Sequence, residues 1–318
     1  MKLLITGGCG YLGGRLAQFL ASQTGHEILL GSRQYAAPPS WLPQAKVAQT
    51  PWDSSSGLEQ SCAGVEAVVH LAGMNAQDCA ADPVAALEVN AVATARLLQA
   101  AIRQGVKRFI YLSTAHVYGS PLKGVITEES CAAPLHPYAT SHRAGEDVVR
   151  AASQRREVEG IVIRLSNAYG APAHKEVHCW MLLVNNLCRQ AVTTEGMVLH
   201  SSGRQRRDFI PLADACRAMQ HLLELPAAGV SEGLFNVGSG WTPTVLEMAQ
   251  RIAQRVQAVT GRPPEILRHE ERESSAADSL DYRTDRLAET GFHGKGTDNV
   301  DRELDELIHF CLEQAHKS

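Results

Sequence analysis

The fold of this chain is decided by residues 3–13, LLITGGCGYLG. An apolar strand pattern comes first, a turn with three spaced glycines follows, and a helical pattern then runs on to Ser22. Gly7, Gly10 and Gly13 let the backbone turn tightly, approach phosphate oxygens and pack the helix on its strand. The first N–H groups of the helix carry partial positive charge. A second apolar strand pattern begins at Glu27, and this context predicts a site for the pyrophosphate of a dinucleotide.

Composition agrees with a soluble enzyme. The 318 residues suffice for one large or two coupled domains, and the formal charge of −4 gives no electrostatic case for a nucleic-acid or membrane partner. The eight cysteines lack any Cys-x-x-Cys pair and predict reduced, mostly buried thiols. The strand at Leu3 leaves no room for a signal peptide, and no apolar stretch approaches the length of a membrane span. We therefore expect a cytoplasmic protein.

Strand and helix patterns alternate along the first half of the chain. Strand patterns cover residues 3–6, 27–31, 67–71, 108–113 and 160–165, and helical patterns cover residues 83–104 and 138–154. Runs of Val, Ile and Leu joined by crossovers of this length predict an α/β fold with a Rossmann-type, doubly wound parallel sheet. We expect residues 1–170 to form the dinucleotide-binding domain.

The pattern is less regular beyond residue 170. Helical patterns cover residues 180–190, 245–259 and 302–315, and a strand pattern covers residues 234–237. We expect residues 171–318 to form a smaller C-terminal substrate-binding region, with strand 234–237 free to return to the main sheet.

Six further motifs follow the glycine turn. They are VVHLAG (68–73), IYLSTAHVYG (110–119), PYATSH (137–142), RLSNAYG (164–170), RDFI (207–210) and FNVGSG (235–240). Together with the turn they resemble the extended short-chain dehydrogenase/reductase family, in its NAD-dependent epimerase/dehydratase branch of nucleotide-sugar enzymes. The resemblance covers residues 1 to 290 and implies an NAD(P)-dependent oxidoreductase acting on a nucleotide-activated sugar.

The resemblance also implies the catalytic residues. Tyr138 would donate or accept the proton, and Thr114 would hydrogen-bond the reacting oxygen. His142 stands where the family has a lysine, four residues after Tyr138 on one face of a predicted helix, so both can meet the same cofactor. A histidine, with a reference pKa of about 6.5, can bond the nicotinamide ribose but seldom carries the charge that stabilises a phenolate. A neutral Tyr138 can still protonate a ketone, so His142 fits reduction better than oxidation.

Cofactor choice is expected at the end of the second strand. Relatives that use NAD carry an acidic residue there, whereas this chain has Ser32 and Arg33, which suit a 2′-phosphate. NADP(H) is favoured, and NAD(H) stays open. The resemblance places Asp53 beside the adenine amino group. The other implied cofactor contacts are Gly7, Gly10, Tyr11, Leu12, Gly13, Leu71, Ala72, Gly73, Tyr138, His142 and Leu165.

On the substrate side, the resemblance aims Arg207 at the nucleotide diphosphate, with Asn167 beside it. His116 is a candidate substrate contact. It follows Ala115, and the two stand where the family's sugar 4,6-dehydratases carry an Asp-Glu pair, which disfavours a dehydratase. The spacing of His174, His178 and Cys179 could suit a metal, but no carboxylate cluster accompanies them, so we expect no metal.

The sequence therefore favours a keto-sugar reductase that uses NADP(H). Two alternatives stay open: a nucleotide-sugar 4-epimerase that retains NAD, and a non-catalytic dinucleotide-binding sensor or assembly protein. The helices expected over residues 83–104 and 138–154 match those that pair relatives, so the resemblance also implies a homodimer.

Overall fold

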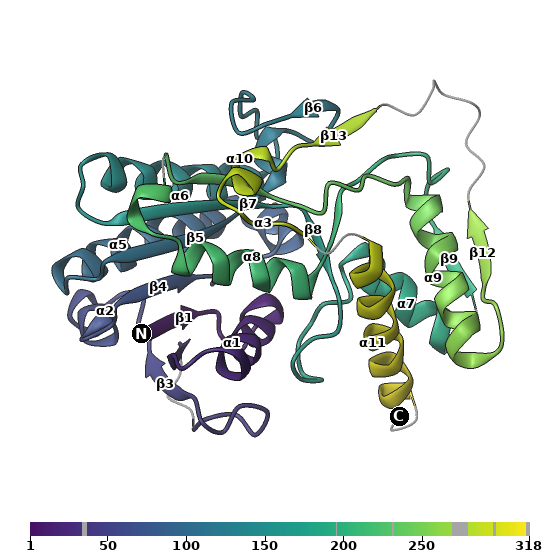
Figure 1. Cartoon of the computed structure of the whole chain (residues 1–318), viewed down its shortest axis with the longest axis horizontal. Helices are drawn as coiled ribbons and strands as arrows, with labels where there is room; N and C mark the ends of the chain where they lie inside the picture. The colour runs from purple at the N-terminus through teal and green to yellow at the C-terminus, as the bar shows by residue number, and fades with distance from the viewer. Residues whose placement is uncertain (34–36, 195, 231, 269–278, 295–296, 316–318) are drawn as a thin grey trace.

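The computed structural model describes the chain except residues 34–36, 195, 231, 269–278, 295–296 and 316–318. Its centre is a seven-stranded sheet in the order β11-β7-β5-β4-β1-β2-β3, with every neighbouring pair parallel (Figure 1). The strands are β1 (Lys2–Thr6), β2 (Glu27–Ser32), β3 (Lys46–Gln49), β4 (Ala67–His70), β5 (Arg108–Thr114), β7 (Glu159–Leu165) and β11 (Leu234–Val237). The predicted doubly wound α/β fold is confirmed.

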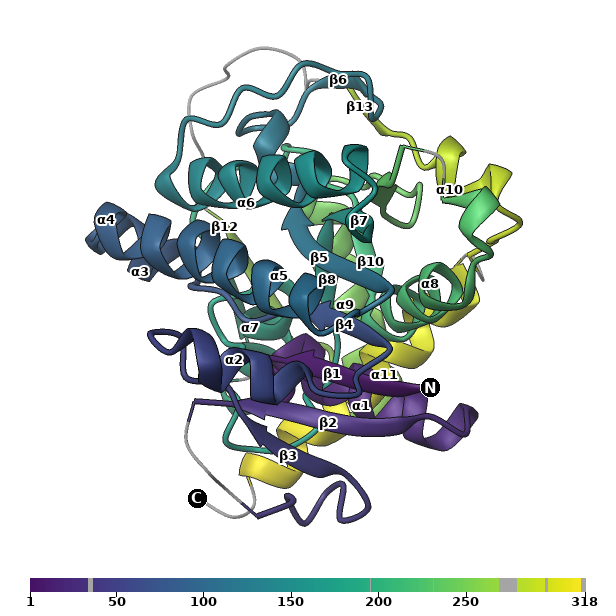
Figure 2. The same ribbon diagram turned by 90° about the vertical axis from the view of Figure 1, so that its left-hand side faces the viewer.

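Both faces of this sheet are covered by helices (Figure 2). Leu3 and Ile5 pack against α1 (Tyr11–Gln23) and α8 (Leu212–Glu224) on one face. Leu4 points to the other face, which is covered by α2 (Ser55–Cys62), α5 (Ala93–Arg103) and α6 (Pro137–Gln154). Side chains alternate between the faces of a strand, so burial on both sides explains the uninterrupted apolar runs of the sequence.

Two elements differ from the pattern-based expectation. The edge strand β3 was not predicted, because its four residues are exposed or half-buried and do not form an apolar run. The helix expected over residues 83–104 is divided into α4 (Pro83–Leu87), a π-helical turn at Glu88–Val92, and α5. The wider turn contains Asn90, which is buried and bonds both Met74 N and the Ser141 hydroxyl, so tertiary contacts prevail over a regular helix here.

A second apolar core lies beside the carboxyl ends of the strands (Figure 1). It is formed by α7 (Leu183–Thr193), α9 (Val245–Thr260), α11 (Thr297–Ala315) and the parallel pair β9 (Gly196–Leu199) and β12 (Glu265–Arg268). Between β9 and α9 the chain returns to the main sheet, where β11 pairs with β7. The remaining elements are α3 (Ala76–Ala81), η2 (Ala115–Tyr118), β6 (Gly124–Ile126), β8 (Asn167–Tyr169), β10 (Phe209–Pro211), η3 (Ala227–Gly229), β13 (Leu280–Tyr282) and α10 (Asp285–Glu289).

A buried ion pair fixes α6 on the sheet. Arg164 of β7 donates from Nε to Oε1 of Glu146 at 2.9 Å and from a terminal nitrogen to Oε2 at 2.6 Å. The Ser113 hydroxyl of β5 donates to the same carboxylate at 2.5 Å. The side chains of Arg164 and Glu146 are 2% and 0% exposed. Three elements therefore meet at one carboxylate, which sets how α6 is rotated about its axis.

The eight cysteines are free, and six of them are buried, as the sequence predicted. The two exposed thiols belong to Cys9 and Cys131. Within the described ranges, no helix combines the length and the apolarity that a bilayer-spanning segment requires.

Replacing Arg164 by Met should lower the free energy of unfolding by about 3–5 kcal/mol, because the buried Glu146 carboxylate then loses its buried cation and keeps only Ser113 and a longer contact with Arg143 at 3.3 Å. Urea denaturation followed by circular dichroism measures this. The control is Arg155→Met, which breaks an exposed pair with Glu157 and should leave the unfolding free energy almost unchanged. Equal effects of the two variants would contradict the anchoring role of Glu146.

Candidate active site

The glycine turn forms a cradle at the amino end of α1. Gly7 has a φ of +67°, and a Cβ on it would lie 2.8 Å from the backbone nitrogen of Ala72. A Cβ on Gly13 would lie 2.1 Å from the Gly7 carbonyl oxygen. Gly10 is the N-cap of α1 and supplies no side-chain hydrogen bond to the first N–H groups of the helix. These amides suit phosphate oxygens, so the turn fits a dinucleotide pyrophosphate.

The side chains that follow the turn serve packing. The Tyr11 hydroxyl lies 3.0 Å from the Gly170 carbonyl and 3.2 Å from Oδ1 of Asn185. Leu12 is buried in the core between α1 and the sheet. Arg15 donates to the Ala171 carbonyl at 2.7 Å. The side chains of Tyr11 and Arg15 thus tie α1 to the second region, and the backbone at residues 11 and 12 is what stays available to a phosphate.

The other predicted cofactor residues lie near the carboxyl edge of the sheet, where ligands of such folds bind. Ser32 ends β2 and is half-buried, and Arg33 follows it and is exposed. Leu71, Ala72 and Gly73 follow β4, and Leu165 ends β7. Asp53 comes after β3, where its side chain is fully exposed and lies 3.1 Å from Arg96.

Thr114 and Tyr138 are brought together from two elements. Thr114 ends β5, and Tyr138 lies in the first turn of α6. Burial raises the pKa of the Tyr138 phenol to about 12, and a hydrogen bond with Thr114 acts in the opposite direction. Tyr138 is therefore a protonated phenol at neutral pH, held beside the threonine hydroxyl.

The His142 ring lies edge-on to the Tyr138 ring, with 4.5 Å between the ring centroids. Burial lowers the pKa of His142 to about 4, and the Leu112 carbonyl opposes this shift. His142 is consequently neutral near neutral pH, so the cation that a lysine would supply is missing beside Tyr138. This arrangement suits a phenol that donates its proton and not one that starts as phenolate.

The sequence did not single out Tyr111, which lies behind His142. Its hydroxyl is 3.1 Å from Nδ1 of His142 and 3.1 Å from the Asn90 carbonyl. Tyr111 occupies an apolar position of β5, so its pattern marked a core residue and hid its polar contacts.

The predicted substrate residues gather around β8, β10 and η2. Arg207 precedes β10, and burial lowers the pKa of its guanidinium. Burial also lowers the pKa of His116, and the charges of Arg207 and His136 add to this effect. Asn167 donates from its side chain to the Asp208 carbonyl at 2.9 Å, which fixes it in the β8–β10 pair.

Asp208 is a second polar group that sequence reasoning missed. Its carboxylate accepts bonds from the Ser166 hydroxyl at 2.5 Å, the Ser239 amide at 3.0 Å and the Gly240 amide at 2.9 Å. Burial raises its pKa to about 6, and these hydrogen bonds act in the opposite direction. Asp208 joins the ends of β7 and β11 beside Arg207, and its position in the RDFI motif was the available signal.

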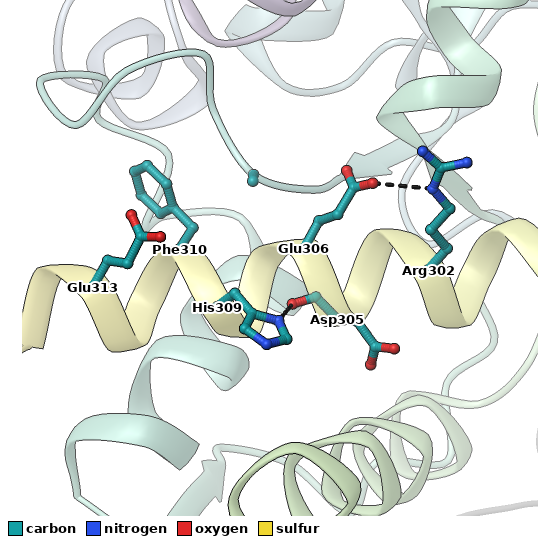
Figure 3. A pocket seen from close by; sticks show the side chains of 7 residues that line it. Arg302, Asp305, Glu306, His309, Phe310 and Glu313 are labelled. Atoms are coloured by element: carbon teal, nitrogen blue, oxygen red, sulfur yellow. Dashed lines mark hydrogen bonds and ion pairs between the residues drawn. The ribbon is translucent and has the colours of Figure 1, made fainter.

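A surface hollow of about 600 Å³ lies along α11 (Figure 3). Several of its side chains have partners within the chain: Arg302 donates to Glu306 at 3.1 Å, Arg255 donates to Asp305 at 2.7 Å, and Nδ1 of His309 lies 2.7 Å from the Asp305 carbonyl. None of its lining residues is a predicted site residue.

In the part of the chain that the structure describes, no group of three or more His, Cys, Asp or Glu side chains is arranged to hold a metal ion. His174 instead lies with Nε2 3.0 Å from the Cys9 carbonyl and stacks on Trp41.

A family model described as the NAD dependent epimerase/dehydratase family matches residues 3–238. The chain belongs to this family. A dTDP-glucose 4,6-dehydratase of Actinoplanes sp. is 30% identical over 319 residues, which cover 91% of this chain and 96% of the relative. Among solved structures, MoeE5 in complex with UDP-glucuronic acid and NAD aligns with a TM-score of 0.80 at 23% identity, covering 99% and 100% of the two chains. RMD from Pseudomonas aeruginosa, complexed with NADPH, gives a TM-score of 0.77 at 22% identity, covering 98% and 99%. The chain is thus a nucleotide-sugar-modifying enzyme of this family.

Gly13→Ala should weaken dinucleotide binding by more than about tenfold, because the new methyl group would push the Gly7 carbonyl out of the turn and misalign the phosphate-binding amides. Isothermal titration with NADPH and with NADH measures this. Gly25→Ala is the matched control, since a Cβ there meets nothing within 4 Å. Unaltered binding in Gly13→Ala would exclude the turn as the pyrophosphate site.

Proposed function

We propose that the enzyme uses NADP(H) to reduce a keto group on a nucleotide-activated sugar. The observation that carries the proposal is the contact between Thr114, a protonated Tyr138 and a neutral His142 near the edge of the sheet that bears the glycine turn. A protonated phenol is the form that a reduction needs.

Each residue has a defined part in the reaction. NADPH, when bound, supplies the hydride. The Thr114 hydroxyl orients the substrate carbonyl, and Tyr138 gives its proton to the oxygen as it becomes an alkoxide. With a pKa of about 12, the phenolate that Tyr138 leaves behind is a weaker base than an alkoxide, which favours this proton transfer. His142 hydrogen-bonds the nicotinamide ribose and keeps its place against Tyr138.

The residues beside Thr114 support reduction over dehydration. Ala115 is buried and has no group that can exchange a proton, and burial lowers the pKa of His116, so the imidazole is neutral. The Asp-Glu pair expected of a 4,6-dehydratase is missing from these two positions. Dehydratase relatives therefore share the fold and the cofactor turn with this chain, and we do not transfer their reaction.

Arg33 supports the choice of NADP(H). It lies exposed directly after β2, next to the half-buried Ser32, where a 2′-phosphate would meet a guanidinium and a hydroxyl. Arg207 and Asn167 would meet the diphosphate of the substrate, because the guanidinium offers several donors and Asn167 is already fixed beside it.

The second candidate is a nucleotide-sugar 4-epimerase that retains NAD. Its support comes from the contacts that tie α1 to the second region, those of Tyr11 with Gly170 and of Arg15 with Ala171, which would slow the opening of the cofactor site. The solved neighbour MoeE5 also carries NAD. A non-catalytic dinucleotide sensor is the third candidate, and the missing lysine is the feature that supports it.

We further propose that the enzyme is a cytoplasmic homodimer. Val84, Leu87, Val89 and Val92 leave apolar side chains exposed between 41% and 68% along α4 and the π-helical turn, a face that a second copy could cover. The free thiols agree with a reducing compartment.

Tyr138→Phe should lower turnover of a nucleotide-linked keto sugar by at least about 100-fold, because the proton donor is lost, while NADPH binding stays unchanged. Steady-state assays at saturating NADPH, with binding titrations alongside, measure both quantities. Tyr169→Phe is the control, because its buried hydroxyl has no hydrogen-bond partner among the described residues. Full turnover in Tyr138→Phe would contradict the assignment of Tyr138 as the proton donor.

Arg33→Asp should weaken NADPH binding by about 10- to 100-fold without weakening NADH binding, since the new carboxylate repels the 2′-phosphate and can accept hydrogen bonds from the ribose hydroxyls of NADH. Competitive titrations with both dinucleotides give the ratio of the NADPH and NADH dissociation constants. Arg302→Asp makes the same charge change on α11 and should not alter that ratio. A wild-type protein that prefers NADH, or a ratio that Arg33→Asp does not move, would favour the epimerase.

A further inference from the structure

Tyr111 contacts the His142 ring from β5 and is 1% exposed. Besides Nδ1 of His142 at 3.1 Å, its hydroxyl has three oxygen neighbours: the Asn90 carbonyl at 3.1 Å, the His142 carbonyl at 3.5 Å and the Thr94 hydroxyl. The Asn90 carbonyl also accepts a bond from the Thr94 hydroxyl at 2.8 Å. The contacts of Tyr111 thus comprise two carbonyl groups, one hydroxyl and one ring nitrogen.

Counting protons decides how this group is arranged. The Tyr111 hydroxyl carries one proton, and both carbonyl oxygens can only accept. If that proton pointed at Nδ1 of His142, the hydroxyl oxygen and the Asn90 oxygen would face each other at 3.1 Å without a proton between them. The Asn90 carbonyl would keep its bond from Thr94, but this buried site would contain one hydrogen bond fewer. The proton therefore lies between Tyr111 and Asn90, and the contact with His142 needs a proton from Nδ1.

We propose that Tyr111 is a positioning residue that holds His142 in the tautomer protonated at Nδ1, with the lone pair of Nε2 directed to the cofactor side. A neutral imidazole has one N–H, so a proton on Nδ1 leaves Nε2 an acceptor. Nε2 lies 3.9 Å from where a Cβ on Gly73 would be, and Gly73 is exposed just after β4. That side of the ring therefore meets the edge where the dinucleotide is expected.

The tautomer is not set by a charge next to the ring. The titratable groups around this site are Tyr138 and Glu146 on α6, Tyr111 on β5, His70 on β4 and Cys79 on α3. Burial keeps both tyrosines and the cysteine protonated and holds His70 neutral, while the Glu146 carboxylate is engaged by Arg164. Hydrogen bonding is thus what chooses between the ring nitrogens: the Tyr111 hydroxyl contacts Nδ1, and the Leu112 carbonyl is a further acceptor beside the ring.

The consequence for the cofactor rests on the proposed function. A lysine ammonium at position 142 could only donate to a ribose hydroxyl, whereas Nε2 of this His142 tautomer accepts the hydrogen of that hydroxyl. The exchange of lysine for histidine therefore reverses the direction of the hydrogen bond at the nicotinamide ribose.

Nitrogen-15 spectra of histidine-labelled protein, recorded near neutral pH without dinucleotide or substrate, test the proposal directly. The His142 signals are those missing from His142→Asn. We expect Nδ1 in the range of a protonated ring nitrogen and Nε2 in the range of an unprotonated one. In Tyr111→Phe the preference should be lost, and NADPH should bind about three- to tenfold more weakly. Tyr169→Phe removes a buried hydroxyl that has no partner among the described residues, and it should change neither quantity.

Two results would overturn the proposal: a wild-type His142 protonated at Nε2, or a Tyr111→Phe spectrum with the wild-type tautomer. The wild-type spectrum alone decides the first point even if Tyr111→Phe fails to fold. The measurement is independent of catalysis. The expected tautomer together with an absence of NADPH binding or turnover would leave this inference standing and refute the proposed function.

Discussion

The buried pair of Glu146 and Arg164 is the interaction on which the site depends. Tyr138, His142 and Glu146 follow one another at a spacing of four on α6, so they share one face of the helix. Glu146 accepts two hydrogen bonds from β7 and one from β5, and these bonds fix that face of α6 against the sheet. Thr114 follows Ser113 on β5, so the same carboxylate places the tyrosine of one element beside the threonine of another.

The titratable groups closest to the reaction site are buried and neutral. Burial raises the pKa of Tyr138 to about 12 and lowers those of His142 and His70 to about 4 and about 3. Near neutral pH none of the three carries charge. In the proposed reduction, a phenol gives its proton to a developing alkoxide, without the nearby cation that stabilises a phenolate. The tyrosine expected from the family is thus kept, while a histidine stands at the position of the expected lysine.

Much of the fold could be predicted because the central strands are buried on both faces and therefore appear as long apolar runs in the sequence. The spaced glycines were equally informative, because the turn leaves little room for a side chain at these positions. The edge strand β3 and the three-residue pairs such as β8–β10 leave no such run. At the site, motif residues could be named, but Tyr111, Arg164 and Asp208 take their roles from partners far away in sequence. Two of the missed residues had a signal in the sequence: Glu146 lies four residues after His142, and Asp208 lies in the RDFI motif.

The central claim is net reduction, and the most direct test is a stoichiometry. The enzyme is incubated with NADPH deuterated at the transferred position and with a panel of nucleotide-linked keto sugars, and the cofactor and the sugar are analysed together by mass spectrometry. The account predicts one NADPH oxidised for each alcohol formed, with the deuterium on the carbinol carbon. A sugar that is isomerised or dehydrated while the dinucleotide returns to its starting redox state would contradict it.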